Sequence, residues 1–590
     1  MQDPNSFYEK QIHKYQEALA AVKQQLFASS MIRLAVFCLS VFVIYFLFGS
    51  VKWVLAVVLL AIVLFLLLVS RHTDLQYKRD KLRALISINE TELKVLNHDF
   101  YDLPEGNGFK NSFHHFSQDI DLFGRGSFYQ YANRTALSQG SETLAGLFVE
   151  NSIVDIREKQ KAIQELSRMP EWRQEFSAVA GLVKTETAYT TIIKWMQNYV
   201  PFAPAIMKVL PLVFSILSAL VITSYFMDFV SGRILVGWFF LGLGITGQYL
   251  RKINKLSADT SKIQGTFQQY QKLIVELEEM KFKSKFLQEQ RRTIVDQSEK
   301  TSEILKQFSG LLNALDQRNN IIIGLFTNAF MLRDLQLGLS IEKWIDLHGS
   351  KTEKWFHTIA FFDAYNSLGN FTFNHPGYTF PKLVEHEVVL KSKAAGHPLI
   401  HPDKCVLNDF QIDNEQFFII TGANMAGKST FLRMVSLQIV MANMGLPVYA
   451  GETEYFPIKL ITSMRTTDSL TDDESYFFSE LKRLKFIVEE IKKDRYFIVL
   501  DEILKGTNST DKAKGSRKFV ERLVASKSTG IIATHDLSLC KVAEELPQIE
   551  NHYFDAEIID NELHFDYKFK EGICQNMNAS FLLKKMEIVE

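Results

Sequence analysis

The chain has 590 residues, with 66 lysines and arginines against 67 aspartates and glutamates. This length predicts about three or four domains. The near-zero net charge gives no global signature of nucleic-acid binding, although it does not exclude a local basic stripe. The four cysteines lie far apart, without metal-ligand spacing or a disulfide framework, which is typical of a reducing compartment. We expect no cleavable signal peptide, because a polar N-terminus precedes the first apolar run.

Two uncharged apolar stretches near the N-terminus, 34–51 and 53–70, are each about as long as a membrane-crossing helix needs to be. Basic residues flank the pair at Arg33 and from Arg71 onward, so we expect a transmembrane hairpin with both ends in the cytoplasm. A buried helical hairpin in a soluble core is the alternative. The apolar character all round both helices disfavours it.

A second pair of uncharged stretches occupies residues 209–227 and 234–250, and Arg251, Lys252 and Lys255 follow it. We predict a second transmembrane hairpin here, which gives four spans. Every soluble segment then lies on one side of the inner (cytoplasmic) membrane. The protein is expected to be an integral, multi-pass membrane protein with both termini and its ATP-binding region in the cytoplasm.

The most informative stretch is 417–433, where a β-branched and aromatic run leads into Gly422-x-x-x-x-Gly427-Lys428-Ser429 and then an apolar-periodic helix. Glycines let the backbone wrap close to phosphates, and the N–H groups of the loop and helix start face the anion. The expected ligands are ATP and Mg²⁺, with Lys428 on the β- and γ-phosphates and Ser429 on the metal. The predicted phosphate-binding residues are Gly422, Ala423, Asn424, Met425, Ala426, Gly427, Lys428, Ser429 and Thr430.

A second motif consists of four apolar residues, 497–500, followed by Asp501 and Glu502. It predicts a buried strand with two carboxylates at its carboxyl end, where ligands bind in parallel sheets. Asp501 is expected to act on Mg²⁺ through water, and Glu502 to orient or deprotonate the attacking water. A further apolar run ends at His535, which can contact the γ-phosphate there. The predicted catalytic residues are therefore Lys428, Glu502 and His535.

The loop Thr421-Gly-Ala-Asn-Met-Ala-Gly-Lys-Ser-Thr430 resembles that of MutS proteins, from which it differs only at Ala423. The stretches 119–127 and 154–166, with Asn133-Arg-Thr135 between them, resemble the helical core (lever) domain of that family.

Two further segments resemble the entry into the family's ATPase domain. Residues 355–378 are similar to the segment that returns from the core. Gly396-His-Pro is similar to the Arg-His-Pro that opens the domain, with Gly in place of Arg.

The resemblance implies an α/β P-loop (ABC-type) ATPase domain at the C-terminus and an all-α core/lever region before it. It also implies a homodimer in which a signature segment reaches the partner's ATP. Residues 475–480 are similar to that signature, so Ser475 is expected to be the trans contact, with Tyr476 replacing the family's Thr. Residues 506–511 are similar to the loop at the dimer contact, which assigns Thr510 and Asp511 to it, with one Asn inserted.

The mismatch-reading domain of repair MutS proteins has no counterpart in the sequence, where a membrane hairpin takes its place. We therefore do not expect mismatch recognition by base wedging, while sequence-independent contact with duplex DNA stays open. Residues 257–315 predict a long charged helix, either a coiled-coil arm or a packing helix, with packing or dimer contact favoured.

These features predict a membrane-anchored MutS-like ATPase in which ATP binding and hydrolysis drive dimer closure and core-helix movement, with an unidentified protein partner. A tethered DNA-binding or DNA-damage-sensing protein is the main alternative. An ABC-like transport ATPase is disfavoured, because the Leu-Ser-Gly-Gly-Gln signature is absent. The predicted segments are an amphipathic helix at 1–30, hairpins at 31–71 and 204–250, helical core parts at 72–203 and 251–385 (the second with the long helix), and the ATPase domain at 386–590.

Overall fold

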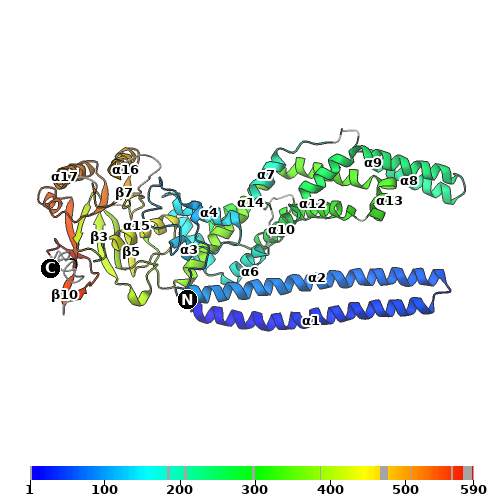
Figure 1. Cartoon of the computed structure of the whole chain (residues 1–590), viewed down its shortest axis with the longest axis horizontal. Coiled ribbons are helices and arrows are strands. Elements are labelled where there is room, and N and C mark those ends of the chain that lie inside the picture. The colour runs from blue at the N-terminus through cyan, green and yellow to red at the C-terminus, as the bar shows by residue number, and fades with distance from the viewer. Residues whose placement is uncertain are drawn as a thin grey trace.

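The computed structural model describes residues 3–182, 187–202, 204, 207, 209–295, 299–319, 321–385, 387–465, 476–505, 508–559, 562–575 and 588. The molecule is elongated, with a mixed α/β region at one end and two groups of helices that extend to the other end (Figure 1). The first described residues lie where the helical and α/β parts meet, and the chain ends in the α/β part (Figure 1).

The N-terminal two thirds of the chain are mostly helical, as predicted. The helices are α1 (Pro4–Phe46), α2 (Val51–Leu96), η1 (Asn107–Phe109), α3 (Phe128–Ala132), α4 (Ser138–Val149), α5 (Ile156–Ser167), α6 (Pro170–Gly181), α7 (Tyr189–Gln197), α8 (Leu210–Phe226), α9 (Gly232–Ser261), α10 (Gln264–Glu279), α11 (Lys285–Arg292), α12 (Thr301–Asp316), η3 (Gln317–Asn319), α13 (Ile321–Met331) and α14 (Arg333–Asn374).

Helices α1 and α2 form a long hairpin that projects from the body (Figure 1). The expected N-terminal amphipathic helix is continuous with the first apolar stretch, so that α1 has 43 residues and α2 has 46. Both contain a window apolar and long enough to cross a membrane, and almost none of that window is buried in the protein. The base of α1 is fixed to the end of α14, where Tyr8 Oη donates to Asn374 Oδ1 over 2.6 Å.

The prediction of four membrane-crossing helices is supported for only two, because among the described residues only α1 and α2 pass the length and hydropathy criteria. Helix α8 is apolar but has 17 residues, and α9 combines an apolar first half with a charged second half. The prediction of a single long helix over residues 257–315 is also wrong. These residues are divided among the end of α9 and helices α10, α11 and α12, which pack against one another and α14.

Helix α14 is the axis of the helical part. Its 42 residues begin beside α8, α9 and α13 and end at the α/β region, a distance of about 60 Å at 1.5 Å per residue. Most of its second half is buried, because α3, α4, α5, α6 and α7 all pack on it. Helix α14 therefore connects the two ends of the molecule (Figure 1).

The α/β region contains two principal sheets. The six-stranded sheet has the order β12-β9-β4-β8-β7-β6, parallel except for β12, and the four-stranded sheet has the order β1-β5-β2-β3. The elements are β1 (Lys382–Leu383), β2 (Val388–Ala395), η4 (Pro402–Lys404), β3 (Asn408–Asp413), β4 (Phe417–Gly422), α15 (Lys428–Met444), β5 (Glu452–Tyr455), β6 (Lys459–Ser463), α16 (Tyr476–Glu490), β7 (Tyr496–Asp501), α17 (Ser509–Ala525), β8 (Thr529–Ala533), η5 (Leu539–Glu544), β9 (Ile549–Phe554), β10 (Glu557–Ile559), β11 (Glu562–His564) and β12 (Lys570–Glu571).

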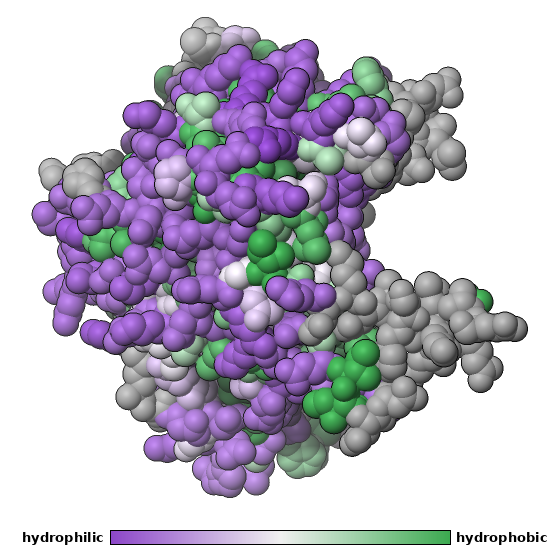
Figure 2. Space-filling view, turned by 90° about the vertical axis from the view of Figure 1, so that its left-hand side faces the viewer, coloured by the Kyte–Doolittle hydropathy of each residue, from purple (hydrophilic) through white to green (hydrophobic). Residues whose placement is uncertain are grey.

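The six-stranded sheet is covered on both faces, which explains why its strands are apolar runs without alternation. Phe418 and Ile420 of β4 face a core shared with α15, whereas Phe417 and Ile419 face a core shared with α16 and α17. The outer surface at this end of the molecule is predominantly hydrophilic (Figure 2).

Candidate functional site

The loop between β4 and α15 has the geometry expected of a phosphate-binding loop. Gly422 and Gly427 have φ of 150° and 108°, and a Cβ on Gly422 would lie 2.5 Å from the Phe554 carbonyl oxygen. Glycine is therefore required at Gly422 both by its neighbour and by its backbone conformation. Lys428 opens α15, and its Nζ donates to the carbonyl oxygens of Gly422 and Ala423 over 2.7 and 2.9 Å. Burial lowers the pKa of Lys428, an effect that the nearby Asp501 opposes.

Ser429 and Asp501 meet at the edge of the sheet. Ser429 Oγ donates to Asp501 Oδ2 over 2.9 Å, although the two residues come from α15 and β7, with β8 between β4 and β7. A hydroxyl beside a carboxylate is a pair of hard oxygen donors of the kind that Mg²⁺ binds together with phosphate and water. No group of three or more His, Cys, Asp or Glu ligands occurs among the described residues, so phosphate and water would have to complete the coordination.

Glu502 follows directly in a strained conformation. Its φ is 60°, in the left-handed region that non-glycine residues adopt at a cost of about 1–3 kcal/mol, typically at functional sites. Its backbone N–H donates to the Ala533 carbonyl over 2.9 Å, and its carboxylate pairs with Lys512 Nζ at 3.4 Å. The strand end and this ion pair hold Glu502 beside Asp501.

His535 lies two residues beyond β8, between the strands that carry the loop and the carboxylates. Burial is the main cause of its lowered pKa, followed by the charge of Lys428, while Glu502 and Asp501 act in the opposite direction. His535 is therefore close to Lys428, Asp501 and Glu502, and the lowered pKa favours the neutral form of its side chain.

Glu480 was singled out in sequence only as the last residue of the signature. It is buried, and its two carboxylate oxygens accept the backbone N–H groups of Leu504 and Lys505 over 2.6 and 3.0 Å. Helix α16, which contains the end of the signature, therefore holds the loop that begins at Glu502. The signature's Ser475 lies outside the described residues.

The inserted Asn508 has a structural role that the sequence did not reveal. Its side chain caps α17 by accepting the Asp511 backbone N–H over 2.9 Å, and it also donates to the Asp511 carboxylate over 2.8 Å. Thr510 and Asp511 are exposed at the start of α17. Both residues are therefore accessible to a second subunit, as the predicted dimer contact requires. The Asp511 carboxylate already accepts a hydrogen bond from Asn508 within the same chain.

A cavity of about 410 Å³ opens beside the phosphate loop. It is lined by His397, Ile400, Lys404, Cys405, Val406, Asn408, Gly427, Thr430, Phe431, Met434, Phe554 and Tyr567. Its volume and mixed aromatic and polar lining suit a nucleoside. The sequence indicated only His397, Gly427 and Thr430 among these walls, because the walls come from four separate segments. Burial lowers the pKa of His397 to about 4.

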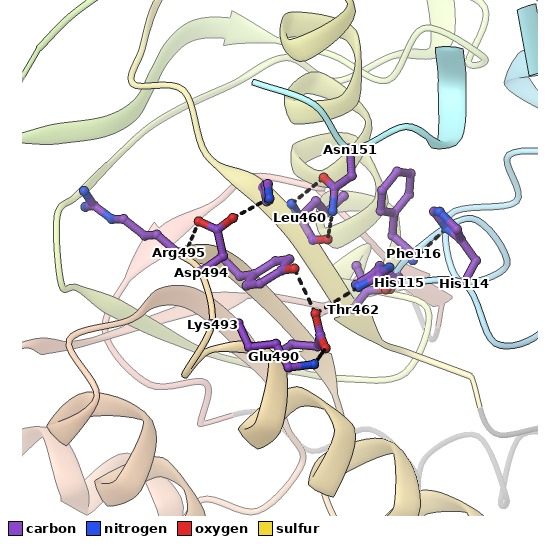
Figure 3. Close-up of polar contacts among 12 residues, drawn as sticks. His114, His115, Phe116, Asn151, Leu460, Thr462, Glu490, Lys493, Asp494 and Arg495 are labelled. Carbon is purple, nitrogen blue, oxygen red and sulfur yellow. Dashed lines mark hydrogen bonds and ion pairs between the residues drawn. The ribbon is translucent and has the colours of Figure 1, made fainter. Parts of the chain in front are cut away.

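The helical part and the ATPase-type part are joined by polar contacts (Figure 3). Asn151 exchanges two hydrogen bonds with the backbone of Leu460 on β6, of 2.9 and 3.0 Å. His115 Nε2 lies 3.4 Å from the Glu490 carboxylate at the end of α16, and Glu490 also accepts from Tyr496 Oη over 3.1 Å. These contacts join two loops of the helical part to the α/β part: the loop after α4 contacts β6, and the loop before α3 contacts α16.

A second set of contacts centres on Asp119 and Asp121, in the stretch that resembles the lever domain. Asp119 accepts the Thr462 hydroxyl and, over 2.9 Å, the Arg465 backbone N–H. Asp121 binds the Arg465 guanidinium through two bonds of 2.6 and 2.7 Å and lies 3.6 Å from Arg433 on α15. The 119–121 loop therefore contacts both the helix after the phosphate loop and the strand that leads to the signature.

The fold and the site define an ATPase-type domain of the P-loop class. The family model for MutS domain V matches residues 418–587. Human "MutS protein homolog 4" is 30% identical over 222 residues, which cover 36% of this chain and 23% of that protein. "DNA mismatch repair protein MutS" of Chloroflexus aurantiacus is 29% identical over 293 residues, which cover 48% of this chain and 29% of that protein.

The chain is thus MutS-like in its C-terminal part, which carries a MutS domain V, an ATPase-related domain. The similarity to the Chloroflexus protein is longer than the segment 386–590, so it extends into the helical part. The chain spans between about a quarter and a third of the length of these curated relatives.

Proposed function

We propose that this protein is a membrane-anchored, MutS-like ATPase. The observation that carries the proposal is the convergence of Lys428, Ser429, Asp501, Glu502 and His535 from three sequence segments at one edge of a parallel sheet. Ligands of open α/β sheets bind at this edge. The match to MutS domain V supports the same assignment.

ATP fits the site in two parts. The backbone N–H groups of the loop and the start of α15 receive the phosphates, with Lys428 beside them, and the adjacent cavity receives the nucleoside. Ser429 and Asp501 would hold Mg²⁺, which would neutralise charge on the phosphates. Glu502 orients or deprotonates the attacking water, and neutral His535 contacts the γ-phosphate.

The dimer is proposed from the resemblance and from the exposure of Asn508, Thr510 and Asp511. In it, Ser475 of each protomer contacts the ATP of the other, with Thr510 and Asp511 at the interface. ATP favours the closed dimer because it makes contacts in that state alone. Glu480 supports this arrangement, since it connects the signature at the start of α16 to the loop of Glu502.

The helical part would move when the dimer closes. The 119–121 loop contacts α15 and the strand before the signature, and α14 runs from this region to the apolar helices. Helices α1 and α2 anchor the protein in the membrane through their exposed apolar halves, with both termini and the ATPase domain in the cytoplasm. The partner on which this movement acts is an unidentified protein.

The direct test is ATP turnover by the purified full-length protein in lipid nanodiscs. We expect phosphate release that requires Mg²⁺ and stops with excess EDTA. No release above that of a nanodisc preparation without the protein would contradict the enzyme assignment.

A second candidate function is DNA binding, which is favoured by the similarity to a protein named as a DNA mismatch repair protein. Binding through the phosphate backbone would weaken as salt is raised. A salt-dependent shift of duplex DNA by the nanodisc-bound protein would support it. Equal affinity for matched and mismatched duplexes would exclude mismatch sensing.

A further inference from the structure

Helices α8 and α13, together with the first half of α9 (residues 232–250), form what we call the helical tip. Large apolar side chains on all three helices, and on the turn between α8 and α9, are exposed. They are Leu212, Val213, Ile216, Leu217, Leu220, Phe226, Phe229, Ile234, Val236, Phe240, Leu241, Leu325, Phe326 and Met331, each between 42% and 80% exposed. Their combined exposed area is on the order of 1,000 Å², beyond the few hundred Å² of the largest apolar patch on a soluble monomer.

Helix α13 is the element of the tip that the sequence did not signal. It has 11 residues without a charge, which gives a length of about 16 Å, roughly half the hydrocarbon thickness of a bilayer. It packs against both α8 and α9, and Phe239 of α9 places its ring 6.0 and 5.9 Å from the rings of Phe326 and Phe330. We propose that the helical tip inserts into the lipid bilayer, with α13 as a short helix that enters the bilayer without crossing it. This inference rests on the proposed membrane anchoring.

The packing within the tip is of the kind found between helices in lipid. A Cβ on Gly242 of α9 would lie 2.0 Å from the Ala329 carbonyl oxygen, so the two backbones approach as closely as a glycine allows. Small residues permit such contacts between membrane helices, where dispersion and hydrogen bonds replace the hydrophobic effect. The tip also contains an interhelical hydrogen bond, from Trp238 Nε1 to Ser218 Oγ over 2.7 Å.

A charged boundary lies at the base of the tip. Exposed Arg251 and Lys252 follow Leu250, the last exposed large apolar residue of α9, and Arg318 pairs with Asp334 at 3.6 Å beside the start of α14. Beyond this boundary, α10 and α12 have no exposed large apolar side chain among their described residues. Cations that flank an apolar segment mark the membrane surface.

Two observations favour lipid over a protein partner. The exposed apolar side chains come from all three helices and the connecting turn, whereas a docking site for one partner occupies one face. The tip also projects toward the same end of the molecule as the turn of the α1–α2 hairpin (Figure 1). One planar bilayer can therefore receive both.

The position of α13 gives the membrane a direct connection to the ATPase-type domain. Only Leu332, with a φ of 50°, separates α13 from α14. Its side chain is fully buried against Phe214 and Leu335, so this break in the helix is fixed by packing. A displacement of α13 in the bilayer would therefore act on α14 at one joint.

The test uses single spin labels on the full-length protein in nanodiscs of phosphatidylcholine and phosphatidylglycerol. The four native cysteines are first replaced by alanine. An unfolding midpoint temperature equal to that of the wild type confirms that the cysteine-free protein folds normally. Labels are then placed at Leu325→Cys and Phe326→Cys in α13, at Leu59→Cys in α2, and at Lys306→Cys in α12 as the aqueous control. Accessibility to oxygen, which partitions into lipid, is compared with accessibility to a water-soluble nickel chelate.

We expect labels at 325 and 326 to be at least tenfold more accessible to oxygen relative to nickel than the label at 306. Nickel-accessible labels at 325 and 326 with a lipid-embedded label at 59 would overturn this inference and leave the anchoring by α1 and α2 intact. Nickel-accessible labels at all of these positions would overturn both. Labels at 325 and 326 that are immobilised and shielded from both reagents would show a protein partner or a second copy in place of lipid.

Discussion

The two ends of this molecule bury and expose opposite kinds of residue. At the ATPase end, Lys428 and Glu480 are buried with defined partners, and the outer surface is hydrophilic (Figure 2). At the other end, large apolar side chains of α1, α2, α8, α9 and α13 are exposed, and exposed charges lie at the base of the helices and at the outer turns, where they are Lys52, Asp228 and Arg233. The first end carries the site proposed for a charged ligand, and the second carries the apolar surfaces proposed to enter lipid.

Because the two ends differ in this way, the helical part between them must connect the proposed nucleotide site to the apolar helices. Helix α14 runs between the two ends, and the 119–121 loop joins the helical part to the α/β part. The loop is fixed by ion pairs and backbone hydrogen bonds, while α14 is fixed by close packing. Substitutions at the proposed ATPase site should have the largest effects, and substitutions in this connection should have smaller ones.

Replacement of Lys428 by Ala should produce the largest effect. The variant loses the cation at the centre of the phosphate loop, so we expect ATP turnover to fall by about 10³-fold, with weaker nucleotide binding. Phosphate release in nanodiscs measures the first, and fluorescent nucleotide titration the second. Lys541→Ala, an exposed lysine on η5, is the matched control and should turn over ATP normally. If Lys428→Ala turned over ATP at the wild-type rate, the proposal that ATP is hydrolysed at this loop would be wrong.

Glu502→Gln should separate binding from hydrolysis. The amide cannot accept a proton from water, so turnover should fall by about 10²-fold while ATP binding is retained. The control is Glu544→Gln, an exposed glutamate in the same domain. A variant that remains monomeric by analytical ultracentrifugation under saturating MgATP would count against the proposed dimer.

Gly140→Ala tests the packing of the connection. A Cβ at Gly140 would lie 2.0 Å from Asp363 Oδ2, and Asp363 is held by hydrogen bonds from the backbone of Ala136 and Leu137. We expect a loss of about 1–3 kcal/mol in the free energy of unfolding. Gly146→Ala on the same helix meets open space, and it should be neutral or gain about 0.5–1 kcal/mol. Chemical denaturation compares the two, and an equal effect would show that this contact is not formed.

The pH dependence of stability should also reflect Asp363. Burial raises the pKa of Asp363 from 3.8 to about 7. Since the folded state then binds the proton more tightly than the unfolded state, this group favours folding at low pH, and its contribution declines as pH rises from about 4 to about 7.

Asp363→Asn removes this dependence. Relative to wild type, the midpoint temperature of the variant should rise by about 2–4 °C between pH 5 and pH 8. The control Asp346→Asn, at an exposed position on the same helix, should follow wild type at every pH. Parallel pH profiles for wild type and Asp363→Asn would refute the assignment.

The sequence predicted the helical and α/β parts and the residues that meet around Ser429 and Asp501, because strand-end motifs lead to one edge of a parallel sheet. It did not predict the cavity beside Gly427, whose walls come from segments without a shared motif. It also missed Glu480 as a support of the Glu502 loop, since such a contact depends on tertiary packing. The second hairpin was assigned from hydropathy and from the basic residues that follow it, neither of which shows that α8 ends after 17 residues or that α13 packs beside it.

The central claim is that nucleotide at one end moves helices at the other. It is tested most directly by the distance between spin labels at Lys306→Cys in the two protomers of Glu502→Gln, measured by pulsed electron resonance in nanodiscs. The account predicts a defined distance in MgATP that shifts by several Å or is lost when the nucleotide is removed. An identical distance distribution in both conditions would contradict it.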